Sequence, residues 1–360
     1  MKVMVVISGW GYGGSQQVAR ILVKWLNLNN YHSIMLSLNN IEEEINGLDS
    51  KNLKCLSQNS NFVKKIYLLR KEILMNCPDI VLVMGLPLDV YVIPAAMKIK
   101  TKVIVSERND PFHFHGKCIT KAVSRWLMKF ADGFVFQTQD AKKYYASRTK
   151  NRGVVIGNPL ANLSEYPNPY RGIRKKYFVT IGRLIKQKNQ KLLLEAFHDV
   201  HEKYPEYELH FWGEGKEKEN LIHYSQKLNI QDVVQFKGTR DDVLDVIKDS
   251  TAFVLTSDFE GMPNTLMEAM AIGLPCISTD CSCGGPRELI ENYDNGILVP
   301  VGDREKLKNA MIYLIENPSI AFALGKNALK IRDNYDEKTI CEKWVKYFKA
   351  VNEERDDQNN

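Results

Sequence analysis

Long apolar runs are missing from this sequence of 360 residues. No uncharged apolar run is longer than that from Ile80 to Leu88, which contains Pro87, whereas a helix that spans a bilayer needs about 20 apolar residues. We therefore expect no transmembrane helix. Cysteine is also scarce, and seven cysteines are too few to hold a chain of this length together by disulfide bonds. We expect reduced thiols and a cytosolic protein.

Several patterns that would assign a function directly are also missing. There is no zinc-finger spacing, no RNA-recognition pattern and no basic tract interleaved with aromatic residues, so we expect no nucleic-acid partner. Cys276, Cys281 and Cys283 lack a neighbouring histidine or a second cysteine pair and fit a zinc site poorly. We expect no signal peptide, because the apolar run from Val3 to Ile7 is too short for one.

The charge that is present is unevenly distributed. Residues 1–165 carry 22 Lys and Arg against 12 Asp and Glu, whereas residues 166–360 carry 27 against 31, so the net charge of +6 conceals a basic first half. A basic first half indicates an anionic partner, for example lipid headgroups or a phosphorylated acceptor. The length, with 44% apolar and 26% charged residues, is typical of a globular protein of two domains.

Short apolar segments alternate with helix-length amphipathic segments, which is the pattern of βαβ units and parallel sheets. Prolines and glycines between Gly157 and Lys176 indicate a linker. We predict an α/β protein with two doubly wound domains, 1–165 and 166–334, facing each other across a cleft, then a helix over 335–350 and a disordered tail over 351–360. The predicted strands are 2–7, 33–38, 80–84, 102–105, 133–137 and 153–156 in the first domain, and 177–181, 208–212, 233–236, 252–256, 275–279 and 296–299 in the second.

A glycine-rich loop follows the first predicted strand. Gly9, Gly11 and Gly14 have the spacing of a dinucleotide-binding loop, but that loop also needs an acidic residue after the second strand, where this sequence has Asn39. The sequence therefore argues against a nicotinamide enzyme. Gly13 and Gly14 still leave backbone amides open to an anion at a helix amino terminus, and a tight turn without a ligand is the alternative.

Two groups of residues in the second half suit a phosphorylated ligand. Arg183 and Lys188 lie five residues apart across a loop after a predicted strand, and a guanidinium with an ammonium suits the two phosphates of a nucleotide diphosphate. A solvated surface is the alternative for each. Glu260 and Glu268 flank Pro263, which suits a helix start that leaves the next amides open to an anion. Eight residues of helix would separate these carboxylates by roughly 12 Å, so we expect them to bind different parts of one elongated ligand.

The order and spacing of these motifs resemble glycosyltransferase family 4, or group 1, whose members are retaining enzymes of the GT-B fold. The resemblance extends over nearly the whole chain, and in that family the last helix crosses back onto the first domain. The segment from Ser106 to Pro111 is similar to bacterial members that add hexoses or N-acetylhexosamines to lipid-linked or capsular glycans. The motifs that carry the resemblance are Gly13-Gly14, Gly157-Asn158-Pro159, Gly182-Arg183 with Lys188, Gly213-Glu214-Gly215, Phe236-Lys237-Gly238, Glu260 with Glu268, and Asn295-Gly296 with Asp303.

The resemblance implies roles for these residues toward a nucleoside-diphosphate sugar, with UDP as the expected nucleotide. Arg183 and Lys188 would bind the diphosphate and stabilise its charge as it leaves. Glu268 would bind the ribose and Glu260 the donor sugar, so Arg183, Lys188 and Glu260 are the expected catalytic residues. No metal is then needed, and we expect no cofactor. The other donor-binding residues implied are Gly13, Gly14, Gly213, Phe236, Asn264, Thr265 and Leu266, with Gly284, Gly285 and Glu288 as further candidates.

The catalytic base is left open by the sequence. Many members of the family carry a histidine at the end of a first-domain strand, whereas this strand leads into Glu107 and Arg108, with His113 and His115 following. These four residues are candidates for the acceptor side or for the base, and an ordinary loop position is the alternative for each histidine. If the reaction proceeds on one face of the sugar, the donor phosphate can accept the proton and no protein base is required.

A basic helix face in the first half suits a membrane. Lys117, Lys121, Arg125 and Lys129 recur every fourth residue on a predicted helix and would form one stripe. Such a stripe suits anionic headgroups or a lipid diphosphate acceptor, and a solvated face beside core aromatics is the alternative. We expect a cytoplasmic protein bound peripherally to the inner face of the cytoplasmic membrane.

The function expected from these motifs is that of a retaining glycosyltransferase in polysaccharide synthesis, for example of capsule or lipopolysaccharide. It would move a hexose or N-acetylhexosamine from a UDP-sugar to a glycan or an undecaprenyl-diphosphate-linked acceptor. Two alternatives stay open: a sugar-nucleotide epimerase of the same fold, and a non-catalytic glycan-binding subunit. An epimerase would isomerise its substrate without an acceptor, and a binding subunit need not bind UDP.

Overall fold

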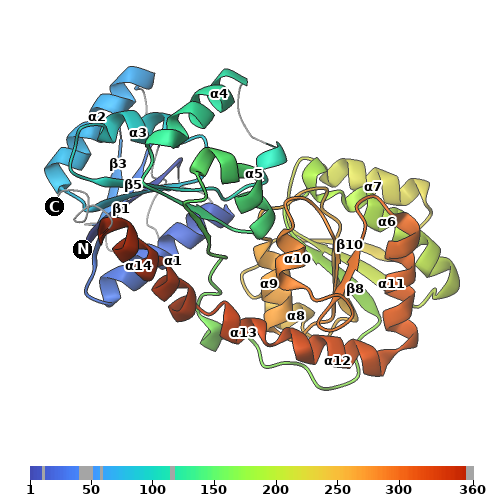
Figure 1. Ribbon diagram of the computed structural model, residues 1–360. Helices are drawn as coiled ribbons and strands as arrows, with labels where there is room; N and C mark the ends of the chain where they lie inside the picture. Colours follow the sequence, from blue (N-terminus) through green and yellow to red (C-terminus); the bar gives the residue numbers. More distant parts are fainter. Residues whose placement is uncertain (10–12, 40–51, 57–59, 114–117, 354–360) are drawn as a thin grey trace. The chain divides into compact units, whose positions relative to one another are not determined.

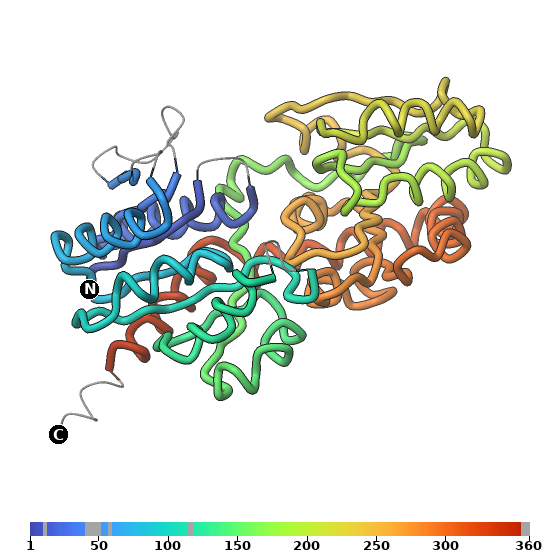
Figure 2. Tube along the Cα trace, turned by 90° about the horizontal axis from the view of Figure 1, so that it is seen from above, coloured from blue at the N-terminus to red at the C-terminus, as the bar shows by residue number. Residues whose placement is uncertain are grey.

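The computed structural model describes residues 1–9, 13–39, 52–56, 60–113 and 118–353 of the protein. The chain divides into two compact units, which Figures 1 and 2 show as ribbon and tube. Unit 1 consists of Met1–Ala161 together with Tyr335–Asn360, and unit 2 consists of Asn162–Asn334. The sequence predicts these boundaries at residues 165 and 335. Within the described ranges, no helix combines the length and the apolar character that a membrane span requires.

Unit 1 is built on a parallel sheet, which among the described residues has seven strands in the order β3-β2-β1-β4-β5-β6-β7. The central strand β1 is buried from Val3 to Ile7 because both faces of the sheet are covered. Val3, Val5 and Ile7 alternate onto one face and pack in one core with α1 and α14. The strands are β1 (Lys2–Ile7), β2 (His32–Ser37), β3 (Leu53–Cys55), β4 (Ile80–Met84), β5 (Lys102–Ser106), β6 (Gly133–Phe136) and β7 (Gly153–Val155).

The helices of unit 1 form a layer on each face of this sheet (Figure 1). On one face α1 packs against α14, and on the other α2 packs against α3 and α3 against α4. The α-helices are α1 (Gly14–Leu28), α2 (Phe62–Asn76), α3 (Asp89–Ala96), α4 (Cys118–Leu127), α5 (Gln139–Thr149) and α14 (Glu337–Glu353), and the short 3-10 helices are η2 (Pro111–His113) and η3 (Met128–Phe130).

Unit 2 repeats the doubly wound arrangement around a parallel sheet. Over its described residues the sheet has six strands in the order β10-β9-β8-β11-β12-β13. Phe178, Leu209 and Phe211 from β8 and β9 pack in one core with α6, α7, α11 and α12. The strands are β8 (Tyr177–Ile181), β9 (Glu208–Trp212), β10 (Val234–Gly238), β11 (Ala252–Leu255), β12 (Cys276–Thr279) and β13 (Ile297–Val299).

The helices of unit 2 connect successive strands and also follow the last strand. The 3-10 helix η5 (Lys186–Lys188) lies between β8 and α6 and carries one of the predicted site residues. The others are η4 (Leu163–Glu165), α6 (Gln190–Lys203), α7 (Lys218–Lys227), α8 (Val243–Ile247), α9 (Asn264–Ala271), α10 (Gly285–Leu289), α11 (Arg304–Glu316), α12 (Pro318–Ala328) and α13 (Ile331–Asn334).

The predicted strands all occur in the structure, with ends that differ by at most two residues. The edge strand β3 was missed, because its three residues are at best half-buried and show no alternating pattern. The prediction of a disordered tail from residue 351 is wrong at its start. The apolar stripe of Trp344 and Phe348 continues to Val351, which is buried, so α14 extends to Glu353. The rest of the predicted tail, 354–360, lies outside the described residues.

Candidate functional site

Glycines let three strand ends of unit 2 approach one another closely. The backbone of Gly213, after β9, has a φ of +136°, and a Cβ atom there would lie 2.0 Å from the carbonyl oxygen of Gly182 after β8. The amide of Gly213 donates to Gly238 O, at the end of β10, at 2.7 Å. Only glycine permits this approach, so the three loops gather at the carboxyl edge of the sheet, where ligands of open α/β sheets bind.

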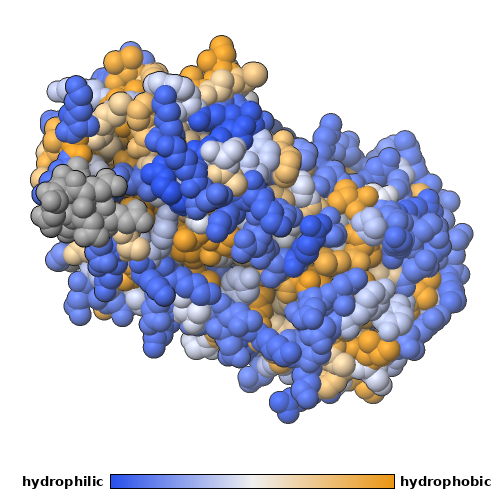
Figure 3. All heavy atoms as spheres, viewed as in Figure 1, coloured by the Kyte–Doolittle hydropathy of each residue, from blue (hydrophilic) through white to orange (hydrophobic). Residues whose placement is uncertain are grey.

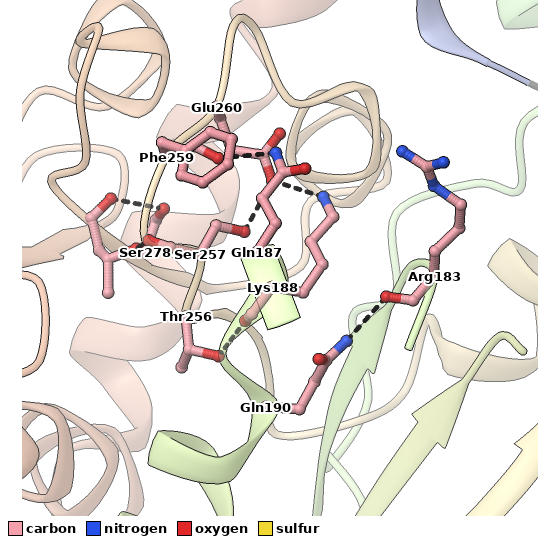
Figure 4. A network of polar contacts seen from close by, with 10 residues as sticks. Arg183, Gln187, Lys188, Gln190, Thr256, Ser257, Phe259, Glu260 and Ser278 are labelled. Atoms are coloured by element: carbon pink, nitrogen blue, oxygen red, sulfur yellow. Dashed lines mark hydrogen bonds and ion pairs between the residues drawn. The ribbon is translucent and has the colours of Figure 1, made fainter. Parts of the chain in front are cut away.

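Lys188 and Glu260 form an ion pair at this edge (Figure 4). Lys188 Nζ lies 2.5 Å from Glu260 Oε1, and the two side chains are only 13% and 10% exposed. The buried Ser257 hydroxyl donates to the same oxygen at 2.6 Å. Two donors therefore fix Oε1, and among the residues that the structure describes Oε2 accepts no hydrogen bond. This orientation leaves Oε2 for a hydroxyl group of a ligand.

Further hydrogen bonds hold the loop after β8 against the loop after β11. Gln187 Nε2 donates to Phe259 O at 2.8 Å, and the amide of Asp258 donates to Gln187 O at 2.9 Å. The Thr256 hydroxyl donates to Lys188 O at 3.0 Å. Backbone and side-chain contacts thus fix both ends of the ion pair before any ligand binds, which reduces the entropy cost of binding.

Arg183 lies apart from this pair. Its side chain is exposed, and in Figure 4 its guanidinium lies separately from Lys188 and Glu260, with no contact drawn between them. Gln190 Nε2 donates to Arg183 O at 3.0 Å and so positions its backbone. Over the described part of the chain the guanidinium has no hydrogen bond or ion pair, so its donors are available to an anion.

The amino terminus of α9 follows Glu260 by four residues, a span of at most about 14 Å. The sequence predicts Pro263 as the first helical residue, whereas in the structure it is the N-cap and the helix starts at Asn264; no side chain caps the helix. Thr265 Oγ1 is buried and has no hydrogen-bond partner within the described residues. The Leu266 side chain is buried in the core, so only its amide can reach a ligand. A first turn without a side-chain cap, next to the unpaired Thr265 hydroxyl, suits a phosphate.

Glu268 lies one turn further along α9. Burial raises the pKa of Glu268 to about 7, so the carboxyl group changes charge near neutral pH. Burial, and then the nearby Glu268 carboxylate, raise the pKa of the Tyr166 phenol above its ordinary range. The structure therefore places Tyr166, from the linker, close to Glu268.

The loop before α10 packs against the Glu260 loop. A Cβ atom at Gly285 would lie 1.7 Å from the carbonyl oxygen of Gly261, so the two backbones are in direct contact. The amide of Glu260 donates to Ser282 O at 2.9 Å. Gly285 is thus required by packing, while Glu288 lies in the first turn of α10.

Phe236 has a different environment from the other predicted donor-binding residues. Its ring stacks on Phe211 with 4.9 Å between centroids and packs against the core of unit 2. A contact between Phe236 and a donor would therefore have to come from its backbone.

Two residues near this site were missed from the sequence. Ser257 had a signal, because a hydroxyl residue two positions after the end of a strand and three residues before the acid can reach its carboxylate. Tyr166 had none, because it lies in the proline-rich linker and meets Glu268 only through the tertiary fold.

The comparison with known proteins identifies this region. Residues 171–331, nearly all of unit 2, match the model of glycosyl transferases group 1. Unit 2 belongs to the group 1 glycosyl transferases. The predictions of a glycosyltransferase and of the GT-B fold are confirmed.

Several relatives of this chain are named as glycosyltransferases. An uncharacterized glycosyltransferase of Methanocaldococcus jannaschii is 36% identical over 63% of this chain and 62% of its own length. Lipopolysaccharide 1,6-galactosyltransferase of Salmonella typhimurium is 37% identical over 41% of this chain and 42% of its own length. This chain thus spans less than two thirds of either relative. The amylovoran biosynthesis glycosyltransferase AmsD of Erwinia amylovora is 24% identical over 95% of this chain and 98% of its own length. The glycosyltransferase is therefore related to enzymes of lipopolysaccharide and exopolysaccharide synthesis.

A solved structure shares the whole fold. HepE of Anabaena, in complexes with UDP and with UDP-glucose, has a TM-score of 0.83 at 17% identity, covering 97% of this chain and all of that chain. At this identity the likeness establishes the fold of the glycosyltransferase.

The glycine loop of the glycosyltransferase lies in unit 1. Gly13 is the N-cap residue of α1, which begins at Gly14, and no side chain caps this helix. A Cβ atom at Gly13 would lie 2.2 Å from Oε1 of Gln16, so the Gln16 side chain takes the space that such an atom would need. Gly11 lies outside the described residues, and the contact of Gly13 and Gly14 with donor phosphates stays a prediction.

Glu107 is enclosed in unit 1 of the glycosyltransferase. Its Oε1 accepts hydrogen bonds from the amides of Arg108 at 2.9 Å and Asn109 at 3.1 Å, and its Oε2 accepts one from the Tyr145 hydroxyl at 3.2 Å. Burial raises the pKa of Glu107 to about 7. Only 3% of Glu107 is exposed, and its carboxyl oxygens accept hydrogen bonds from inside unit 1. This enclosure argues against Glu107 as a catalytic base, because a base must reach the hydroxyl group of the glycan.

Arg108 is enclosed in the same way. It donates to Asn158 Oδ1 and, at 3.3 Å, to Ile156 O, and its guanidinium lies 6.0 Å from the ring centroid of Trp344 in α14. Burial lowers the pKa of Arg108 to about 9. The Arg108 side chain therefore links the end of β5 to the segment after β7 and to α14. These contacts give Arg108 a structural role.

The two histidine candidates differ in what the structure describes. His113 is half-exposed, and its Nδ1 lies 2.6 Å from Asp110 Oδ2, so a carboxylate orients its ring. His115 lies outside the described residues. The role of either histidine as a base stays a prediction.

The basic stripe is not the most exposed face of α4. Lys117 lies outside the described residues, Lys121 and Arg125 are half-buried, and Arg125 donates to the Tyr144 hydroxyl. Lys129 is exposed in η3. The alternative of a solvated basic face beside core aromatics is wrong for the aromatics, because Trp126 and Phe130 are exposed.

One group of side chains in the described residues is close enough to share a cation. Ligand atoms of His198, Asp199 and Glu202 on α6 lie within 4.8 Å of one another. Asp199 is already paired with Arg304 and lies 3.2 Å from His198 Nδ1, so the group is part of an ion-pair network.

Proposed function

We propose that this glycosyltransferase transfers a hexose or N-acetylhexosamine from a UDP-sugar to a lipid-linked or cell-surface glycan, with retention of the anomeric configuration. The observation that carries the proposal is the buried pair of Lys188 and Glu260, followed within four residues by the open first turn of α9. This arrangement offers cationic and amide donors to a diphosphate and a carboxylate oxygen to sugar hydroxyls.

The departing diphosphate defines the role of the cations. As the glycosidic bond breaks, negative charge grows on the phosphate oxygens, and fixed donors stabilise that charge more than the ground state. Lys188 supplies a charge held in place by Glu260, and Arg183 supplies an exposed guanidinium that a phosphate can bind in bidentate fashion. We expect transfer without a metal ion, because these groups supply the required positive charge.

The other donor contacts follow from the chemistry of the groups present. Glu260 Oε2 accepts a hydroxyl of the transferred sugar, and Glu268 accepts the ribose hydroxyls. Thr265 offers its unpaired hydroxyl and its amide to the distal phosphate. The proton of the acceptor passes to the donor phosphate on the same face of the sugar, which is consistent with the enclosure of Glu107.

The names of this chain's relatives support a proposal for the acceptor. Its relatives include enzymes named for lipopolysaccharide and amylovoran synthesis, which supports a growing surface polysaccharide as the product. Such glycans are built on lipid carriers, so we propose an undecaprenyl-diphosphate-linked acceptor at the inner face of the cytoplasmic membrane.

Thermal stabilisation by a panel of nucleotide sugars tests the donor. UDP-hexoses or UDP-N-acetylhexosamines are expected to raise the melting temperature more than GDP- or ADP-sugars, since ligand binding to the native state alone stabilises it. A larger shift with another nucleotide would overturn UDP. Transfer to a lipid-linked glycan should persist in EDTA, and isomerisation of the nucleotide sugar without acceptor would instead indicate the epimerase.

A further inference from the structure

An apolar stripe covers the exposed face of α4. Ile119, Val123, Trp126 and Phe130 follow one another at steps of four, three and four residues, which places them on one side of a helix. Ile119 is 77% exposed and Trp126 is 56% exposed, although large apolar residues of helices usually face the core. The side of α4 that faces the protein carries Ser124 and Leu127.

A second apolar stripe lies on α2. Val63, Tyr67 and Leu74 lie on one side of this helix at steps of four and seven residues, and all three are more than half exposed. Leu69 and Ile73 occupy the opposite, buried side. Figure 3 shows apolar surface along the edge of unit 1 where Figure 1 places α2 and α4.

The helix α3 joins these two helices into one layer. Phe62 of α2 packs on Tyr91 of α3 with 4.8 Å between ring centroids. On the other side, the Ser124 hydroxyl of α4 donates at 2.7 Å to Asp89 of α3, and both residues are fully buried. The two stripes are therefore presented by one packed layer and can engage the same surface.

The charges beside the two apolar stripes are mostly positive. Residues 118–130 contain Lys121, Arg125 and Lys129 and no acidic residue. Lys129 Nζ lies 4.4 Å from the ring centroid of Trp126, so a cation sits directly beside the exposed indole. On α2 the single acid, Glu72, is paired with Lys54, while Lys64 and Lys71 are exposed beside the apolar stripe. A second copy of this surface would place like charges opposite each other, whereas an anionic surface complements them.

We propose that α2 and α4 dock unit 1 on an anionic lipid bilayer, with the stripe of Ile119, Val123, Trp126 and Phe130 inserted among the headgroups. Apolar side chains enter the boundary with the acyl chains, the indole of Trp126 lies at the interface, and the lysines contact lipid phosphates. The docking extends the proposed function, because a lipid-linked acceptor would then be presented to the enzyme at the same surface. It differs from the basic stripe expected from the sequence, since apolar insertion and α2 both contribute.

Flotation with vesicles tests this docking. The full-length protein is expected to float with vesicles of equal parts phosphatidylcholine and phosphatidylglycerol and at least tenfold less with phosphatidylcholine alone. Ile119→Gln with Trp126→Gln should reduce flotation at least tenfold, because polar amides replace the inserted side chains. Val63→Gln with Tyr67→Gln should reduce it less. The matched control is Ile320→Gln with Phe322→Gln, which removes two exposed apolar side chains of α12 in unit 2 and should leave flotation unchanged.

Each contrary result has a defined meaning. Unchanged flotation of the α4 variant, or equal binding to neutral vesicles, would overturn the proposal. So would a dimer of the free protein that the α4 variant dissociates, since the stripe would then bind a second copy. UDP binding by calorimetry serves as the folding control for every variant. Because flotation does not depend on transfer, failure of this docking and failure of the proposed donor chemistry are distinguishable.

Discussion

The Lys188 ammonium lies 2.5 Å from the Glu260 carboxylate, in a pair that is almost fully buried. The sequence assigns the two residues to different parts of a ligand, the lysine to a phosphate and the acid to a sugar. Their contact means that neither residue can be replaced without consequences for its partner.

Lys188→Ala should lose both transfer and stability. Removing the cation leaves the Glu260 carboxylate buried without compensation, which costs about 3 kcal/mol in the free energy of unfolding. Chemical denaturation measures this loss. The double variant Lys188→Met with Glu260→Leu removes both charges and should recover most of the stability while staying inactive. Equal destabilisation of the single and double variants would show that the ion pair is not the cause.

Ser257→Ala should lower kcat at least tenfold while UDP affinity is unchanged. Its hydroxyl holds Glu260 Oε1, so its loss allows the carboxylate to rotate away from the sugar without disturbing the phosphate contacts. The matched control is Ser278→Ala, because Ser278 is equally buried but donates to Thr279 O. Full activity of Ser257→Ala would exclude a role of Ser257 in positioning the Glu260 carboxylate.

Affinity for UDP should rise between pH 6 and pH 8. Because burial raises the pKa of Glu268 to about 7, the carboxylate that accepts ribose hydroxyls forms over this range. The same shift means that the native state binds the proton more tightly than the unfolded chain, so this group's contribution to stability is present at low pH and is lost as the pH rises through about 7. Calorimetry of Glu268→Gln should give a flat pH profile, and an unchanged slope would exclude Glu268 as its origin.

Arg183→Ala should weaken UDP binding at least tenfold without changing the melting temperature. The side chain is exposed and holds no partner within the described residues, so only the ligand contact is lost. Lys186→Ala is a suitable control, because it removes an exposed cation from the same loop. Equal weakening by the two variants would mean that general charge, and not a contact by Arg183, drives binding.

Much of the fold was predictable because it depends on local pattern. The strand of Lys2 to Ile7 and the strand of Tyr177 to Ile181 were found with their ends, since short apolar runs between helical periods indicate parallel strands. The end of α14 was missed by a few residues, because composition favoured a polar tail while the packing of Val351 extended the helix.

The described strands other than β3, the glycines at strand ends and the residue types that suit a nucleotide sugar could be read from the sequence, because they depend on spacing along the chain. It is the packing of the elements that pairs Lys188 with Glu260, encloses Glu107 and exposes Trp126. Partners 72 residues apart, and the covered or open side of a helix, are set by how elements pack together, which a local pattern does not contain.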